Sequence, residues 1–432
     1  MTGSTALLTD HYELTMVQAA LASGAAHRRS VFEVFARRLP DGRRYGVVAG
    51  TGRLLDALAD FRFGEEQIES LRERRVVDEP TLDWLAGYRF SGTITGYAEG
   101  EIQFPGSPVL VVEASFAEGV ILETIALSIL NHDSAIAAAA SRMTGAAGER
   151  PCIEMGSRRT HEEAAVAAAR AAYIAGFSTT SNLAAGQRYG VPTAGTAAHA
   201  FTLLHDTERA AFDAQVASLG SDTTLLVDTY DIPEGVRNAV AAAGTGLGAV
   251  RIDSGDLVVG AHAVREQLDA LGARDTRIVV TSDLDEFAIA TLRAAPVDMY
   301  GVGTSLVTGS GAPTAGMVYK LVAHEDEHGE LIGVAKKSKD KASVAGRKYA
   351  MRRMSPDGVA QAEVIGLGER PSNDGDDRPL MVDLVVDGER VYKDDLDTAR
   401  DRHAASRAQL PPAATQLSRG EPVIPTIYED HA

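Results

Sequence analysis

Residues 250–283 read VRIDSGDLVVGAHAVREQLDALGARDTRIVVTSD, and their pattern decides the fold. The apolar run Val250–Asp253 predicts a strand, the Ala-rich stretch Leu257–Leu271 predicts a helix, and Ile278–Ser282 predicts a second strand. Gly272 suits the end of the helix, because glycine readily adopts the left-handed backbone that stops a helix. A strand, a helix and a strand in this order indicate a parallel βαβ unit.

The same alternation repeats along the middle of the chain. Further strands are expected at Ile153–Ser157, Phe177–Ser181, Pro192–Thr196, Leu225–Asp228 and Met299–Thr304, and further helices at His161–Ala175, Pro233–Ala243 and Leu284–Ala294. Asp228, Asp253 and Asp283 each come at the end of a predicted strand. Seven strand–helix units exceed what a simple open sheet needs, so the sequence predicts an α/β fold with an irregular (β/α) TIM-like barrel. A doubly wound parallel sheet is the alternative.

Both flanks of the chain show the apolar alternation of antiparallel strands. The segments concerned are Tyr88–Ile94, Glu101–Val112, Met317–Val322, Leu331–Val334, Arg347–Met354 and Leu380–Val386. We therefore expect a second, β-rich domain formed from both chain ends, residues 1–118 and 317–432, the latter with a helical tail. The barrel, residues 119–316, would be the catalytic domain.

Amino-acid composition favours a globular enzyme over a membrane, secreted or nucleic-acid-binding protein. The 432 residues are 45% apolar and 24% charged, as in ordinary globular proteins. We see no run of 18 predominantly apolar residues and no basic N-terminal flank, so neither a membrane span nor a signal peptide is expected. The single cysteine, Cys152, favours a cytoplasmic enzyme. The net charge of -18 disfavours nucleic acid and anionic lipid, so an anionic substrate would need a local basic pocket.

Two polar clusters follow late predicted strands. Gly301-Val302-Gly303-Thr304 can bring backbone N–H groups close to a phosphate, although a tight turn is the alternative. Arg251 to Asp256 places an arginine and two carboxylates at one strand end, suited to ribose hydroxyls or to the magnesium of a diphosphate. The alternative there is a helix cap by Ser254 or Asp256.

Three more clusters have comparable alternatives. Arg158 and Arg159 suit a phosphate, or else pair with nearby glutamates on a helix surface. His199 suits a base, a ligand or a phosphoryl acceptor, or else is a buried structural histidine. The basic run Lys336–Arg353, with Lys320 nearby, suits an anion-capturing flap or a charged edge strand.

Taken together in chain order, these motifs resemble the nicotinate phosphoribosyltransferases of the type II phosphoribosyltransferase superfamily. The motifs are Thr9-Asp10-His11-Tyr12-Glu13-Leu14-Thr15-Met16, Phe32-Glu33-Val34-Phe35-Ala36-Arg37-Arg38-Leu39-Pro40, Thr180-Ser181-Asn182, Val227-Asp228-Thr229-Tyr230-Asp231, Arg251-Ile252-Asp253-Ser254-Gly255-Asp256, Ser282-Asp283-Leu284-Asp285-Glu286 and Gly301-Val302-Gly303-Thr304. The resemblance implies that nicotinate and phosphoribosyl diphosphate give nicotinate mononucleotide and diphosphate, with ATP hydrolysis and Mg²⁺, in NAD synthesis. It also implies a homodimer with shared active sites, acting on small molecules.

The resemblance assigns a role to each matching position. For nicotinate these are Tyr12 from the partner subunit, Arg158, Thr196 and Arg251; for phosphoribosyl diphosphate, Arg37, Asp228, Asp253, Gly301, Gly303, Thr304, Lys320, Lys337 and Lys341; for phosphorylation by ATP, His199; for Mg²⁺, Asp228 and Asp253; and for catalysis, His199, Asp253 and Arg251. Met155 departs from the family, which often has an aromatic residue there. The segment 343–346 departs too, because it lacks the expected proline.

Rival functions differ in testable ways. A related enzyme acting on nicotinamide or quinolinate is separated only by substrate kinetics. An aldolase-like sugar-phosphate barrel should carry a lysine inside a central strand, and the predicted barrel strands contain none. A non-catalytic metabolite sensor would not need the histidine linked to ATP.

Overall fold

The computed structural model describes residues 3–336 and 343–429. The chain divides into two compact units: unit 1 is Met1–Ala135 with Thr314–Ala432, and unit 2 is Ile136–Pro313. The first change of unit falls inside helix α6 (Glu123–Ala147) rather than at residue 118. The reason is that apolar side chains early in this helix, such as Ile125 and Leu130, belong to the core of unit 1.

The main sheet of unit 1 is antiparallel, in the order β13-β12-β1-β5-β3-β17-β18. Its strands are β1 (Arg29–Ala36), β3 (Thr93–Tyr97), β5 (Leu110–Ser115), β12 (Met317–Glu325), β13 (Leu331–Gly333), β17 (Met381–Val386) and β18 (Glu389–Arg390). Val34 of β1 lies opposite Leu110 on one side and opposite Tyr319 on the other. One sheet thus contains strands from both ends of the chain.

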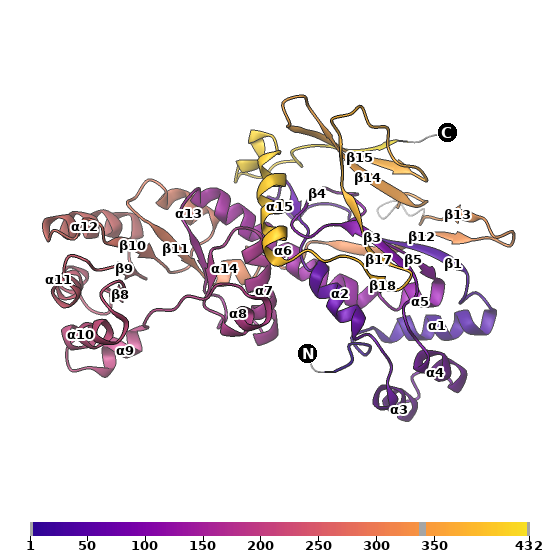
Figure 1. Cartoon of the computed structure of the whole chain (residues 1–432), viewed down its shortest axis with the longest axis horizontal. Coiled ribbons are helices and arrows are strands. Elements are labelled where there is room, and N and C mark those ends of the chain that lie inside the picture. Colours follow the sequence, from indigo (N-terminus) through magenta and orange to yellow (C-terminus); the bar gives the residue numbers. More distant parts are fainter. Residues whose placement is uncertain (1–2, 337–342, 430–432) are drawn as a thin grey trace. The chain divides into compact units, whose positions relative to one another are not determined.

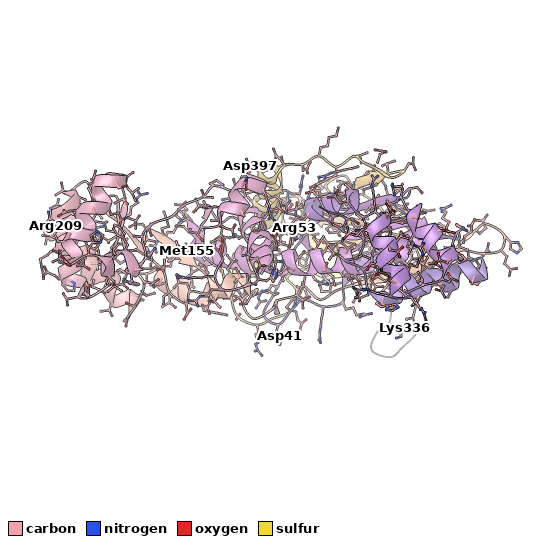
Figure 2. All side chains as sticks on the ribbon, turned by 90° about the horizontal axis from the view of Figure 1, so that it is seen from below. Asp41, Arg53, Met155, Arg209, Lys336 and Asp397 are labelled. Atoms are coloured by element: carbon pink, nitrogen blue, oxygen red, sulfur yellow. The ribbon has the colours of Figure 1, made fainter. Side chains whose placement is uncertain are left out.

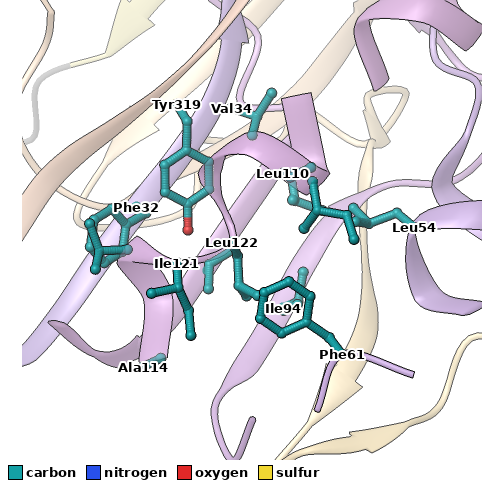
Figure 3. Packing of buried hydrophobic residues seen from close by; sticks show 14 of the residues in the cluster. Phe32, Val34, Leu54, Phe61, Ile94, Leu110, Ala114, Ile121, Leu122 and Tyr319 are labelled. Carbon is teal, nitrogen blue, oxygen red and sulfur yellow. The ribbon is translucent and has the colours of Figure 1, made fainter. Parts of the chain in front are cut away.

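One face of this sheet carries the hydrophobic core of unit 1, part of which Figure 3 shows. Phe32 and Val34 point into the core because alternate residues of a strand share a face. The Phe32 ring stacks on Tyr319, with 5.2 Å between ring centroids. Helices of unit 1 outside α6 are α1 (His11–Ser23), α2 (Thr51–Ala59), α3 (Glu65–Glu73), α4 (Glu79–Ala86), α5 (Phe116–Val120) and α15 (Leu396–Ala408), with a 3-10 turn at Pro412–Thr415.

A second sheet of unit 1 has the order β16-β14-β15-β19. Its strands are β14 (Lys348–Met354), β15 (Ala360–Leu367), β16 (Arg378–Pro379) and β19 (Thr426–Glu429); β2 (Gly46–Val47) and β4 (Ile102–Gln103) form a separate pair. Two ion pairs are almost fully buried here, Arg352–Glu363 and Lys348–Glu33, each with 2.6 Å between nitrogen and oxygen. These four buried charges are therefore neutralised in pairs within unit 1.

Unit 2 contains a parallel sheet in the order β7-β6-β11-β10-β9-β8. Its strands are β6 (Cys152–Glu154), β7 (Thr179–Thr180), β8 (Thr224–Leu226), β9 (Ala249–Ile252), β10 (Arg277–Val280) and β11 (Met299–Val302). The first strand pairs with the last, Ile153 opposite Gly301, so the sheet curls back on itself as a half-barrel.

The predicted strand Pro192–Thr196 is reduced to one bridge, Thr180 to Thr193. Between Thr193 and β8 the described residues show no strand pairing. Pro192 has no N–H to donate, and the small residues around Gly195 are poor strand formers. The fold is therefore mixed α/β with a curled parallel sheet, and a closed TIM-like barrel stays a prediction.

Helices follow the strands of unit 2 as the sequence predicts, and Figure 1 shows α11 and α12 outside β8 and β9. They are α7 (Glu162–Ile174), α8 (Leu183–Tyr189), α9 (His199–Leu204), α10 (Glu208–Leu219), α11 (Ile232–Ala243), α12 (Leu257–Ala270), α13 (Glu286–Leu292) and α14 (Thr304–Val307). Pro233 stands in the first turn of α11, where its missing N–H costs nothing. The carboxyl ends of the parallel strands are therefore each followed by a loop and a helix.

The stretch Phe116–Ala147, comprising α5 and α6, is long and apolar enough to cross a membrane by length and composition. This differs from the expectation that no such stretch exists. However, 61% of its apolar window is buried inside the protein. A core helix of a soluble protein passes the same test, so the stretch is weak evidence for a membrane span.

Candidate active site

The predicted site residues of unit 2 lie where its parallel strands end. Arg158 follows β6, Asp228 follows β8, Asp253 follows β9, and Gly303 follows β11. Loops at the carboxyl ends of parallel strands meet at one edge of the sheet, which is where α/β enzymes bind their ligands.

Arg251 belongs to β9, and its guanidinium contacts the segment between Thr193 and β8, which has no strand pairing within the described residues. Nη1 donates to Thr196 Oγ1 at 2.6 Å, and Nη2 donates to the Ala197 carbonyl at 3.1 Å. Nε is buried and has no hydrogen-bond partner in the described part of the chain. Burial lowers the pKa of Arg251, against the opposite influence of Asp253 and Asp228. A desolvated cation of this kind favours an anionic ligand.

Asp228 holds the loop after β9. Its Oδ2 accepts from the Asp253 backbone N–H at 2.8 Å and from Ser254 Oγ at 2.7 Å. Its side chain is 1% exposed, and among the described residues Oδ1 has no hydrogen-bond partner. Asp253 Oδ1 accepts from Thr281 Oγ1. Asp228 Oδ1 and Asp253 Oδ2 are therefore the carboxylate oxygens left for a ligand.

His199 stands at the first position of α9 and faces both carboxylates. Its Nε2 is 3.9 Å from Asp228 Oδ1 and 3.9 Å from Asp253 Oδ2, while Nδ1 is 3.1 Å from Thr229 Oγ1. The side chain is 40% exposed, which removes the alternative of a buried structural histidine. The ring is anchored at Nδ1 and open at Nε2.

Gly301, which lies inside β11, is needed first for packing. A Cβ on Gly301 would lie 2.5 Å from Thr281 Cγ2 and 2.8 Å from the sulfur of Met155, whose place in unit 2 is labelled in Figure 2. At Gly303, which precedes α14, the nearest atom to such a Cβ is the Met155 carbonyl oxygen at 3.4 Å. The loop after β6 thus lies directly against the predicted phosphate loop.

The structure decides between a ligand-binding role and a structural role for two of the predicted clusters, Arg251 to Asp256 and Arg158 with Arg159. Asp256 is a helix cap, because its Oδ1 accepts from the backbone N–H groups of Val258 and Val259 at 3.1 Å. Arg158 and Arg159 are exposed, and Glu163 pairs with Arg188 instead of with them. Arg251, Asp253, Asp228 and His199 therefore form the compact centre, with Arg158 at its edge.

Unit 1 brings Tyr12 and Lys320 together around Glu123. Lys320 Nζ lies 3.9 Å from Glu123 Oε1 and donates to the Tyr319 carbonyl at 2.7 Å. Burial, together with the hydrogen bond to Glu123, raises the pKa of the half-exposed Tyr12 phenol. Sequence reasoning missed Glu123, because its proximity depends on β12 lying beside β1.

Arg37 lies elsewhere in unit 1, in a cavity of about 710 Å³. The cavity is also lined by Phe35, Pro105 and residues of the C-terminal segment, among them Pro425 and Tyr428. Within the described residues, the buried Arg37 Nε has no hydrogen-bond partner. Lys337 and Lys341 lie outside the described residues.

The described residues hold no group of three or more His, Cys, Asp and Glu arranged for a metal ion. Asp228 Oδ1 and Asp253 Oδ2 nevertheless fit Mg²⁺, which typically takes one or two carboxylates and completes its shell with water and substrate phosphates.

Comparison with known proteins identifies the family. Residues 7–131 match the nicotinate phosphoribosyltransferase N-terminal domain. A nicotinate phosphoribosyltransferase of Mycobacterium tuberculosis is 60% identical over 429 residues, which cover 97% of this chain and 94% of the relative. That of Bacillus subtilis is 36% identical over 86% of this chain and 78% of its own. The crystal structure of human nicotinic acid phosphoribosyltransferase superposes with a TM-score of 0.83 at 26% identity, covering 98% and 97% of the two chains. The chain belongs to the nicotinate phosphoribosyltransferase family.

Proposed function

We propose that this enzyme joins the pyridine nitrogen of nicotinate to ribose C1′ of phosphoribosyl diphosphate and releases diphosphate, a step of NAD biosynthesis. One observation carries the site assignment: the buried Nε of Arg251, beside Asp228 and Asp253, has no hydrogen-bond partner within the described chain. A guanidinium pairs with a carboxylate through two hydrogen bonds, and the substrate is an aromatic carboxylate. Thr196, Arg158 and Tyr12 would complete the nicotinate site, Tyr12 coming from the partner subunit.

Phosphoribosyl diphosphate, the second substrate, would lie between carboxylates at its ribose and basic side chains at its diphosphate. Asp253 would bind the ribose hydroxyls, and the loop Gly301, Gly303 and Thr304 would bind the 5′-phosphate through backbone N–H groups. Arg37, Lys320, Lys337 and Lys341 would stabilise the departing diphosphate, while the carboxylates favour the positive charge that develops at C1′. Mg²⁺, bound by Asp228 and Asp253, would neutralise the diphosphate.

ATP coupling is proposed for His199. Its Nε2 is open and lies 3.9 Å from each carboxylate. Nε2 would take the γ-phosphoryl group of ATP, leaving ADP, and hydrolysis of the phosphohistidine would then release phosphate in each cycle. The enzyme would accordingly be an ATP-coupled ligase.

A homodimer is supported by apolar side chains around the carboxyl ends of the parallel strands. The exposed ones are Leu183, Leu203, Leu204, Tyr230, Val259 and Phe287. Leu183, Tyr230, Val259 and Phe287 come shortly after β7, β8, β9 and β10, whereas Leu203 and Leu204 lie in α9, after the bridge at Thr193. Exposed large apolar side chains that gather in one patch mark interaction surfaces, and a dimer contact would cover them. We place the dimer in the cytoplasm, consistent with its one buried thiol, Cys152.

The test is an assay with nicotinate, nicotinamide and quinolinate, each with and without ATP. Nicotinate should exceed nicotinamide at least about tenfold in kcat/KM, because a neutral amide cannot match the bidentate pair. His199→Asn should keep slow transfer and lose both ATP stimulation and ATPase activity. Equal rates for the acid and the amide, or undiminished ATP stimulation in this variant, would contradict the respective assignment.

A further inference from the structure

Glu154 is a buried carboxylate that none of the proposed chemical steps uses. It is the last residue of β6, and its relative exposure is 0%. Its Oε1 accepts the backbone N–H of Gly156, and its Oε2 accepts the hydroxyl of Thr180. The first partner lies on the loop after β6 and the second on β7. One carboxylate therefore ties two neighbouring strand ends together.

The hydrogen bonds around Glu154 suit an ionised carboxylate. Asn182 N–H donates to Thr180 Oγ1 at 2.9 Å, so the Thr180 proton is free to point at Glu154. Asn182 Nδ2 then donates to Ser157 Oγ at 3.0 Å, which closes a ring of contacts between the two loops. In the ionised form, one carboxylate oxygen accepts from the Gly156 N–H and the other accepts from the Thr180 hydroxyl.

The same loop lies against the predicted phosphate loop. A Cβ on Gly156 would meet Glu154 Oε1 at 3.0 Å, the Gly303 carbonyl oxygen at 3.2 Å and Val307 Cγ1 at 2.2 Å. The Met155 N–H donates to the Val302 carbonyl at 2.8 Å. Fixing Gly156 therefore also fixes the spacing between the loops after β6 and β11, where the first and last strands meet.

We infer that Glu154 is a positioning residue, which holds the loops after β6, β7 and β11 in the geometry that binds nicotinate and the 5′-phosphate. The inference rests on the proposed roles of Arg158 and the Gly301–Thr304 loop. Arg158 comes four residues after Glu154 on the tied loop, so loosening Gly156 displaces its guanidinium. A displacement near 1 Å can cost up to about 100-fold in rate.

The chain offers a matched set of variants. Glu154→Gln keeps the shape of the side chain but replaces one acceptor by a donor. Either the Gly156 N–H then loses its acceptor, or Thr180 must turn its proton away and accept from the new amide N–H. Thr180→Val removes one donor. Thr179→Val is the control, because Thr179 is adjacent on β7 and its buried Oγ1 has no hydrogen-bond partner among the described residues.

Steady-state kinetics and thermal melting should be measured on all three. Glu154→Gln should lower kcat/KM for nicotinate roughly tenfold, mainly through KM, and the double variant with Thr180→Val should lose little more. Thr179→Val should match the wild type. Wild-type kcat/KM in Glu154→Gln would overturn the inference, as would a lower melting temperature with unchanged kinetics of the folded enzyme.

A pH profile separates positioning from a merely structural role. Burial raises the pKa of the Glu154 carboxyl, and the hydrogen bonds from Thr180 and Gly156 lower it; the basic groups on its own loop, Arg158 and Arg159, are exposed. Thr180→Val should therefore move the acid limb of kcat/KM to higher pH. Adding Thr180→Val to Glu154→Gln should not move it. An unmoved limb in the single Thr180 variant would overturn the inference, whereas an inactive wild type would refute only the proposed function.

Discussion

Arg352 in β14 of unit 1 and Arg251 in β9 of unit 2 both lie within strands, yet their charges are met differently. Arg352 is 0% exposed and donates to Glu363 Oε2 at 2.6 Å and to the Ile102 carbonyl at 2.8 Å. Within the described residues Arg251 donates to a hydroxyl and a carbonyl, whereas Asp253 and Asp228 act on its charge through space. Arg352 is thus neutralised by a carboxylate of the fold, whereas Arg251 has no hydrogen-bonded carboxylate in the described structure and suits an anionic ligand.

Breaking the neutralised pair should have the largest effect, on stability. Arg352→Leu leaves Glu363 buried with the Tyr97 hydroxyl, 2.6 Å away, and the Ser107 hydroxyl as donors but without a cation. Removing one partner of a buried ion pair costs about 3–5 kcal/mol. We expect that loss in urea unfolding of unit 1, with kcat of the folded enzyme unchanged.

The control for this pair removes both charges. Arg352→Leu with Glu363→Leu should recover most of the lost stability, since two apolar side chains leave no unpaired charge. A folded single variant of normal stability but low kcat would break the comparison between the two arginines.

Removing the other arginine should act on catalysis. Arg251→Ala takes away the cation proposed to pair with the substrate carboxylate, so kcat/KM for nicotinate should fall at least about 100-fold, or about 2.7 kcal/mol. The free energy of unfolding should change by less than about 1 kcal/mol, because no carboxylate hydrogen-bonds to this arginine in the described structure.

Arg251→Lys sharpens this test. It keeps the charge and loses the planar fork, so a large part of the loss should persist if bidentate pairing matters. Full activity in the lysine variant would mean that only the charge is needed. A large loss of stability in either variant would show that Arg251, like Arg352, stabilises the fold.

The sequence predicts the centre of the site because the centre depends on short-range order. Strands β9, β10 and β11 fall within one or two residues of the predicted Val250–Asp253, Ile278–Ser282 and Met299–Thr304. Once these strands are parallel, Asp253 and the Gly303 loop must end at the same edge.

Other contacts could not be predicted from local pattern. Glu123 meets Lys320 only because β12 joins β1, which lies almost three hundred residues earlier in the chain. The segment after Pro192 follows the apolar-to-polar pattern of its neighbours, but the missing proline N–H and the small residues around Gly195 leave it with a single bridge. The packing reason for Gly301 depends on Met155 and Thr281, which no spacing rule brings together.

The smallest expected effect concerns His403 of α15, a buried titratable group of unit 1. Burial, with Arg407 and Arg400, lowers the pKa of His403 to about 3. The pKa of an unfolded histidine is near 6.5, so below that pH His403 is protonated in the unfolded chain but stays neutral in the folded chain. Stability should therefore fall as pH drops from 6.5 toward 3, by about 2 kcal/mol at pH 5. His403→Gln should flatten that part of the profile in urea unfolding between pH 7 and 5, while kcat of the folded enzyme stays as in the wild type. If the variant loses stability with the same slope against pH, the acid sensitivity of unit 1 belongs to other groups. If His403→Gln changes kcat instead, a buried charged group of unit 1 influences catalysis. The contrast between a stabilising unit 1 and the catalytic Arg251 would then be wrong.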